Sequence, residues 1–127
     1  MVFDFRDLEA KKVEHMRDGE GHVFTKRVDQ EGMGGIIINT IPPGCSIGLH
    51  QHTTNFEVCY IISGKAYEVT PEGKELLEPG MVAYCPNMGS HSLVNEFDED
   101  FVFFGVLPDV KKFCTVTGNF DLPELID

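Results

Sequence analysis

Residues 42–64 read PPGCSIGLHQHTTNFEVCYIISG, and this stretch decides the fold. It holds two short runs of apolar and β-branched residues, 47–52 and 56–63, with turn-forming residues around them. Such runs are typical of β-strands. Successive side chains of a strand point to opposite faces, so His50 and His52 project to the same side. The stretch therefore predicts two neighbouring strands, the first with a pair of imidazoles on one face.

Runs of the same kind continue on both sides of this stretch. They lie at 22–28, 36–41, 65–70, 74–77, 81–84, 90–95 and 101–107. Groups of glycine and proline separate them and turn the chain sharply, because proline fixes φ and glycine adopts positive φ. Short strands at close spacing predict an all-β fold, an antiparallel barrel or sandwich. No segment is long enough for the crossover helix of a parallel sheet.

The length of 127 residues predicts a single domain over 1–127. Residues 1–20 are polar with a weak helical rhythm, which indicates an N-terminal arm or a short helix. The barrel is expected over 36–107 and a C-terminal tail over 108–127. The run at 101–107 is apolar on both faces, so something must cover its outer side. A second subunit or the tail, through Phe113, Phe120 and Leu122, could do so, and we predict a homodimer.

The charge balance is acidic, with 10 Lys plus Arg against 21 Asp plus Glu. Such a surface repels phosphate backbones, so we expect no nucleic-acid partner. No apolar run is long enough to span a membrane and the start is unlike a signal peptide, which predicts a soluble, cytoplasmic protein. Cysteines in that compartment stay reduced, and we interpret them as small buried hydrophobic residues. They are Cys45, Cys59, Cys85 and Cys114.

The charged side chain at Glu57 has the opposite parity from the two histidines, so the bend at 53–56 must reset the register. Glu57, Cys59 and Ile61 then face inward. A carboxylate inside a barrel is costly unless it is paired, hydrogen-bonded or bound to a cation. Nearby imidazoles favour the cation, and His91, from a later strand, would close the site.

Each of these residues has a simpler explanation when taken alone. A single buried histidine is usually a hydrogen-bonded structural residue, and two histidines one residue apart often occur by chance. The glutamate and the third histidine stand at compatible positions, and together they favour a metal site over these separate explanations. His15 and His22 lie outside this pattern and are interpreted as surface or packing residues.

Three imidazoles and one carboxylate suit a first-row divalent ion, and abundance favours Mn, Fe, Ni or Zn. Four protein ligands on an octahedral ion leave two adjacent positions free, which is the open geometry of catalysis or of ligand capture. The ion with one glutamate is net positive. A small anionic, bidentate ligand is therefore expected: an oxo acid, an enediol or a dicarboxylate.

These residues closely resemble the two signature motifs of the cupin superfamily. The first motif, G(x)5HxH(x)3,4E(x)6G, is matched at every spacing by Gly44, His50, His52, Glu57 and Gly64. The second, G(x)5PxG(x)2H(x)3N, is matched by Gly80, Pro86, His91 and Asn95. One position departs, because Met88 stands where the motif has glycine.

The resemblance implies a small antiparallel β-barrel, the double-stranded β-helix or jelly roll. It also implies His50, His52, Glu57 and His91 as the metal ligands, and dimers through edge strands are common among cupins of this size. The residues around the first motif look like those of small bacterial cupins, some of them similar to the oxalate-handling branch. Cupins include dioxygenases, decarboxylases, isomerases and ligand-binding domains, so the fold does not choose a reaction.

The leading hypothesis is a small metalloenzyme that acts on a chelating anionic molecule, with catalytic residues unknown. The alternatives are a non-catalytic sensor or binding module, and a metal that only stiffens the barrel. Other polar residues are weaker candidates for roles at the site. Cys59 is more easily explained by packing, and Asn95 by holding a turn. Acid–base roles for Tyr67 and Tyr84, and contacts of Arg27 or Lys65 with a substrate carboxylate, are open, although solvated positions are favoured for the two cations.

Overall fold

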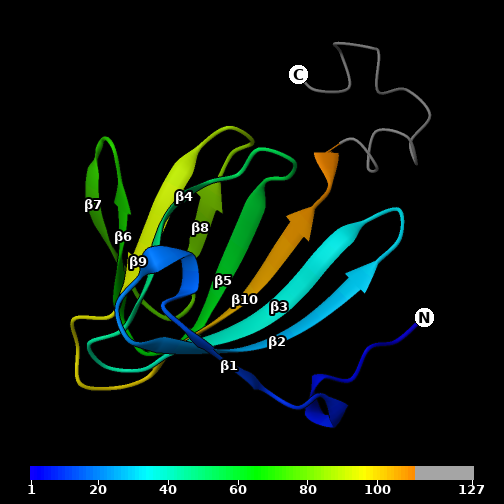
Figure 1. Cartoon of the computed structure of the whole chain (residues 1–127), viewed down its shortest axis with the longest axis horizontal. Coiled ribbons are helices and arrows are strands. Elements are labelled where there is room, and N and C mark those ends of the chain that lie inside the picture. The colour runs from blue at the N-terminus through cyan, green and yellow to red at the C-terminus, as the bar shows by residue number, and fades with distance from the viewer. Residues whose placement is uncertain (111–127) are drawn as a thin grey trace.

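The computed structural model describes residues 1–110, which form two β-sheets that face each other (Figure 1). Two short 3₁₀ turns, η1 and η2, belong to the N-terminal segment. In chain order the elements are η1 (Phe5–Asp7), β1 (Lys11–Glu14), η2 (Met16–Asp18), β2 (His22–Gln30), β3 (Gly34–Ile41), β4 (Ser46–Gln51), β5 (Glu57–Ser63), β6 (Ala66–Thr70), β7 (Gly73–Leu77), β8 (Val82–Cys85), β9 (Ser90–Val94) and β10 (Phe101–Pro108). The predictions for Phe113, Cys114, Phe120 and Leu122 fall outside the described residues.

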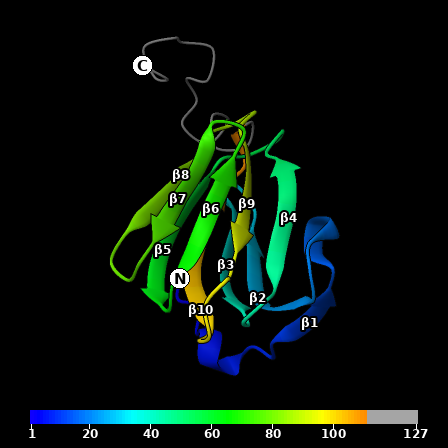
Figure 2. The same cartoon turned by 90° about the vertical axis from the view of Figure 1, so that its left-hand side faces the viewer.

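The larger sheet has six strands in the order β1-β2-β3-β10-β5-β8, and the smaller has four in the order β4-β9-β6-β7. Every strand pair is antiparallel. The register shifts locally in the pairs β4–β9 and β10–β5. Figure 2 looks onto the smaller sheet, with β3, β5 and β10 of the larger sheet behind it. The prediction of an antiparallel all-β fold is therefore confirmed.

The hydrophobic core lies between the sheets and follows from the two-residue period of the strands. In β3 the side chains of Ile37, Asn39 and Ile41 are buried, and those between them are only half-buried. In β10 Phe101 and Phe103 are fully shielded from solvent. The inner faces are thus apolar except where polar side chains gather near the end of β4.

The outer side of β10 is covered in part by the chain's own N-terminal segment, which the sequence did not lead us to expect. The strand lies in the middle of the larger sheet, and its outward side chains are half-buried. The Phe5 ring packs edge-to-face on the Phe104 ring, with centroids 6.2 Å apart, and the Phe5 carbonyl accepts a hydrogen bond from Lys26 Nζ at 3.0 Å. The N-terminal segment therefore covers part of the face that we assigned to a partner or the tail.

Residues 1–20 form an edge strand and two 3₁₀ turns, where we expected an arm or a short helix. The segment Lys11–Glu14 pairs with β2, although only Val13 within it is half-buried. Its sequence lacks the apolar alternation of a strand, so the pairing comes from the open edge of β2 rather than from a local signal. Within residues 1–110 no helix is long and apolar enough to cross a membrane.

The η2 loop, which comprises residues 15–21 between β1 and β2, packs directly against β4, as both cartoon views show (Figures 1 and 2). Two glycines permit this approach. A Cβ at Gly19 would overlap the Ser46 carbonyl oxygen, and a Cβ at Gly48 would overlap the Arg17 carbonyl oxygen. The Ser46 N–H also donates to the Glu20 carbonyl oxygen at 2.9 Å. The loop is thereby fixed beside the end of the barrel that holds the polar cluster.

Met88, where the cupin motif has glycine, adopts the left-handed conformation with φ of 71°. Its N–H donates to the His52 carbonyl oxygen at 2.6 Å, so the turn contacts the cluster's own backbone. A side chain costs roughly 1–2 kcal/mol in this conformation, and glycine avoids that cost. We expect Met88→Gly to raise the free energy of unfolding by about 0.5–1 kcal/mol in urea titrations, after the entropic cost of glycine.

Met81→Gly is the matched control for that substitution. Met81 is also partly exposed, at 42% against 58% for Met88, but it is not among the described residues with positive φ. Glycine at that position should therefore lower the free energy of unfolding. Equal losses in both variants would mean that Met88 is not strained.

Candidate metal centre

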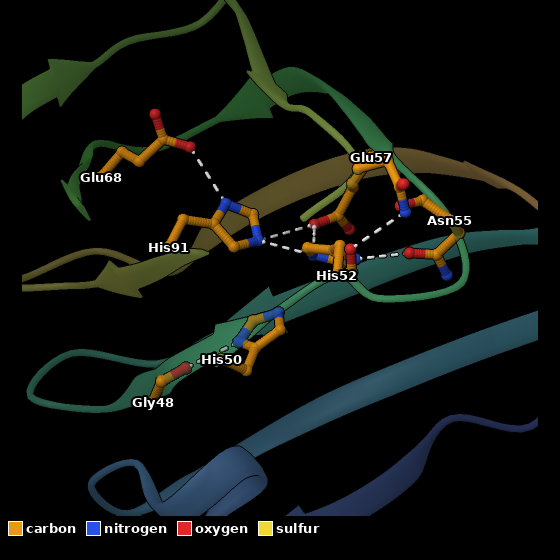
Figure 3. A network of polar contacts seen from close by, with 8 residues as sticks. Gly48, His50, His52, Asn55, Glu57, Glu68 and His91 are labelled. Carbon is orange, nitrogen blue, oxygen red and sulfur yellow. Dashed lines mark hydrogen bonds and ion pairs between the residues drawn. The ribbon is translucent and has the colours of Figure 1, made fainter. Parts of the chain in front are cut away.

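Four side chains with metal-ligating atoms meet between the two sheets (Figure 3). His50 belongs to the end of β4, His52 follows that strand, Glu57 begins β5 and His91 lies in β9. One ligand atom from each lies within 4.8 Å of the others. His50 is half-buried and the other three are buried, so the cluster could hold a metal ion away from bulk solvent.

The strand register explains how the cluster forms. His50 and His91 are directly opposite each other across β4 and β9, beyond a register shift in β4 after Ile47. The bend after His52 brings the chain to the larger sheet, where Glu57, Cys59 and Ile61 are all buried. This inward set is the one that the parity argument predicted.

The atoms at the centre are close enough to interact directly. His91 Nε2 lies 3.0 Å from Glu57 Oε1 and 3.0 Å from His52 Nε2. His52 Nε2 lies 3.4 Å from Glu57 Oε1. Two unprotonated imidazole nitrogens at such a distance repel each other, so a cation or a proton must lie among these atoms.

Each histidine is oriented by an oxygen on its far side. The Nδ1–H groups of His50, His52 and His91 donate to the Gly48 carbonyl oxygen at 2.7 Å, to Asn55 Oδ1 at 2.6 Å and to Glu68 Oε2 at 3.1 Å. These acceptors hold the proton on Nδ1 and leave Nε2 free toward the centre (Figure 3). Metal-ligating histidines typically have such outer partners. The donor set therefore fits a first-row divalent ion.

The electrostatics of the metal-free cluster follow from the same contacts. Burial favours the neutral acid of Glu57, but hydrogen bonds from His52 and His91 outweigh it and lower its pKa to about 2. Burial also opposes a charge on His91, yet its contacts with Glu57 and Glu68 raise its pKa to about 9. The pKa of His50 is lowered, chiefly by burial. Without a metal, His91 and Glu57 thus form a buried ion pair.

This ion pair predicts how the stability of the metal-free chain depends on pH. The Glu57 contribution is complete above its ordinary pKa of 4.5 and is lost as the pH falls toward 2. The His91 contribution is complete below its ordinary pKa of 6.5 and is lost as the pH rises through about 9. Urea unfolding in a chelator should therefore show the pair's largest stabilisation between pH 4.5 and 6.5.

His91→Gln is the control for this pH dependence. The difference in unfolding free energy between the wild type and this variant should shrink as the pH rises from 6.5 to about 9, and as it falls from 4.5 toward 2. A difference that grows from neutral to alkaline pH would contradict the assignment of the ion pair.

A cavity of about 170 Å³ adjoins the cluster. Its polar lining outside the cluster consists of Arg17, Thr25, Arg27 and Asn39, from the η2 loop, β2 and β3. Arg27 forms an ion pair with Asp29 at 2.9 Å, and its side chain is 48% exposed. No ion pair involves Arg17 within residues 1–110. The cavity therefore combines imidazoles with a cationic rim.

Several residues that we considered for the site lie elsewhere. Tyr84 is 60% exposed on the outer surface. Tyr67 packs against Phe97, with Lys74 Nζ 4.0 Å from its ring centroid. Neither tyrosine lines the cavity. Lys65 is exposed and lies 3.6 Å from Glu78, which agrees with the favoured solvated position.

Cys59, Cys85 and Asn95 behave as packing and turn residues. Cys59 is 1% exposed, and burial followed by the charge of Glu57 raises the pKa of its thiol, which disfavours a reactive thiolate. Burial raises the pKa of Cys85 to about 11. Cys45, Cys59 and Cys85 are all buried, as predicted. Asn95 Nδ2 donates to the carbonyl oxygens of Ile41 and Glu99, which holds the predicted turn.

The fold and the cluster define a small double-stranded β-helix protein that could hold a metal ion. The family model described as Cupin domain matches residues 37–107, so the chain belongs to the cupin family.

The chain is similar to proteins named for oxalate and for glucose 6-phosphate. An oxalate-binding protein of Thermotoga maritima is 28% identical over 113 residues, which cover 84% of this chain and 93% of that protein. A glucose-6-phosphate isomerase of Thermococcus onnurineus is 38% identical over 64 residues, only 46% of this chain and 34% of that enzyme. The crystal structure of a predicted oxalate decarboxylase from T. maritima matches with a TM-score of 0.80 and 25% identity, over 86% of this chain and 99% of that one.

Proposed function

We propose that His50, His52, Glu57 and His91 bind a first-row divalent metal, Mn, Fe, Ni or Zn, and that the protein is a small metalloenzyme. The observation that carries this proposal is the outer hydrogen bond of each histidine, which leaves Nε2 directed at the shared centre. When bound, the metal supplies Lewis acidity, and redox chemistry if it is Fe or Mn.

The ligand that we propose is a short anionic oxo acid with two adjacent oxygen atoms. The cavity, at about 170 Å³, is smaller than the roughly 300–1,000 Å³ of sites for drug-sized ligands. Arg17 and Arg27 at its edge attract a carboxylate, and this positive charge favours an acid over a neutral aromatic diol. The names given to the T. maritima relative and to the T. maritima crystal structure both refer to oxalate, which supports the same ligand class.

Within such a site the chain's own residues have distinct tasks. Glu68 accepts the Nδ1 proton of His91 and Asn55 accepts that of His52, so Nε2 is the ring nitrogen that each histidine offers to the metal. Arg17 faces the cavity beside His50 and offers a positive charge to the ligand. The buried positions of His52, Glu57 and His91 limit the access of water.

A binding or sensing module is the second candidate function. The relative named for oxalate binding, rather than for a reaction, favours it. In this case the same metal and the same cavity would capture the acid without turning it over.

The test begins with elemental analysis of protein purified without chelators. Calorimetric titration of metal-loaded protein with oxalate, glycolate and catechol then measures ligand class, and released carbon dioxide or consumed oxygen measures turnover. Binding of a short acid with turnover supports the enzyme, and binding without turnover supports the module. A metal-loaded chain that binds none of the three would refute both.

We also propose that two copies of the chain associate through the outer face of β5 and β8. Tyr60 and Val82 are paired across these strands and are 50% and 59% exposed, and Tyr84 and Ile62 extend the apolar patch. β8 is an edge strand of its sheet within the described residues, so its open edge can pair with a second copy. A cytoplasmic location, expected from the sequence, stays a prediction.

Light scattering should give twice the chain mass at micromolar concentration, and Val82→Lys should reduce it to one chain mass. Leu76→Lys, at a partly exposed leucine of the smaller sheet, is the control and should leave the mass unchanged. A wild-type chain that is monomeric at this concentration would exclude the dimer.

A further inference from the structure

Apart from the cluster, the cavity has a wall with polar side chains, which is made by neighbouring residues of β2 and β3. Thr25 and Asn39 are directly opposite each other across these strands, and Arg27 is opposite Ile37 one step along the same face. All four line the cavity together with the three histidines and Glu57. A molecule held at the cluster would therefore meet this wall with its remaining atoms.

Asn39 is unusual within that wall because its amide is buried without a complete set of hydrogen bonds. The residue is 4% exposed, and its Oδ1 is the buried side-chain oxygen without a hydrogen-bond partner among the described residues. Its neighbours on the inner face of β3, Ile37 and Ile41, are apolar. Burying an unpaired polar atom destabilises the fold, so such an atom calls for an explanation.

Asn95 shows what a structural asparagine looks like in the same protein. It is 0% exposed, its Nδ2 donates to two carbonyl oxygens, and its Oδ1 accepts from the Phe97 N–H at 2.9 Å. The buried hydroxyl of Ser92 is likewise bonded, to the Ile47 carbonyl oxygen at 2.7 Å. Asn95 and Ser92 thus have hydrogen-bond partners, whereas the unpaired oxygen belongs to Asn39, on the cavity wall.

We propose that Asn39 is the ligand-selecting residue of this site, with its amide hydrogen-bonding an oxygen of a short oxo acid. This inference rests on the proposed function and adds the residue that recognises the ligand. A half-turn of the amide exchanges Oδ1 and Nδ2 with little change of shape, so Asn39 can accept from a hydroxyl group or donate to a carboxylate. The small cavity and the cationic edge limit the ligand to an acid of a few carbon atoms.

The test compares Asn39→Leu with the wild type, using zinc because it is not redox-active. Zinc affinity by chelator competition should change little, since Asn39 is not one of the four clustered ligands. The affinity of the zinc-loaded chain for oxalate or glycolate, by calorimetric titration, should fall by about tenfold in the variant, which corresponds to about 1.4 kcal/mol. The Tm of the metal-free variant should rise by a few degrees, because the unpaired oxygen is gone.

Asn95→Leu is the matched control and should lower the Tm, because it breaks three hydrogen bonds. If Asn39→Leu does not fold, Asn39→Ala removes the amide without adding bulk and permits the same titration. Zinc-loaded wild type that binds neither acid would overturn the proposed function itself. Wild type that binds an acid, with an Asn39 variant that binds it equally well or loses zinc, would overturn only the role of Asn39.

Discussion

Replacing His52 by alanine is expected to lower the metal affinity more than about 100-fold while the fold persists. Loss of an outer partner of a ligand typically costs roughly 10–100-fold, and this substitution removes a proposed ligand itself. His52 Nε2 lies 3.0 Å from His91 Nε2, so alanine opens one side of the cluster. The backbone of residue 52 keeps its bonds to Gly89 and Met88, which do not depend on the side chain.

Zinc affinity by chelator competition and the fold by circular dichroism would be measured together. His22→Ala is the control, because the His22 ring contacts Phe24 and does not belong to the cluster. A variant that binds zinc like the wild type would show that His52 is not a ligand. Loss of both zinc and fold would instead favour a metal that only stiffens the barrel.

Gly48→Ala is expected to lower the free energy of unfolding by about 3 kcal/mol, at the upper end for overpacking. A Cβ there would overlap the Arg17 carbonyl oxygen and would lie 2.8 Å from the Gly19 nitrogen. Both neighbours are backbone, so neither can rotate away. The η2 loop would have to lift, and with it Met16, which packs against the core, and Arg17, which lines the cavity.

Gly35→Ala is the matched control for this substitution in urea unfolding. Both glycines lie in strands and neither has a positive φ. The closest atom to a Cβ at Gly35 is Arg27 Nη2, at 2.7 Å, the end of a flexible side chain that can move aside. Equal losses in the two variants would show that the η2 loop yields easily and is not fixed by Gly48.

The strands with alternating apolar residues were predictable from the sequence, because this alternation and the turn residues between the runs are typical of β-strands. The run predicted at 90–95 corresponds to β9, and that at 56–63 to β5. β1 was not predicted, since Lys11–Glu14 has no apolar alternation and pairs only because β2 offers an open edge. The packing of the Phe5 ring on Phe104 was also not predicted, because these residues are far apart in the sequence.

The approach of His50, His52, Glu57 and His91 to one centre was predictable from strand parity and motif spacing. That they hold a metal stays a prediction. The outer partners were missed, because the carboxylate of Glu68 and the amide of Asn55 reach the histidines only through the folded arrangement. Asn39 did leave a signal, because it is polar where Ile37 and Ile41 on the same face of the strand are apolar, but its unpaired amide oxygen is visible only in the structure.

The four clustered side chains come from both sheets: Glu57 belongs to the larger sheet, and His50 and His91 to the smaller. An ion bound by all of them would fasten one sheet to the other. At a free metal concentration of about 100 times Kd, such binding adds about 2.7 kcal/mol to the folded state. Proteases act on opened chains, so the lifetime of this protein in a cell would follow the metal supply, and copies made during scarcity would be degraded first.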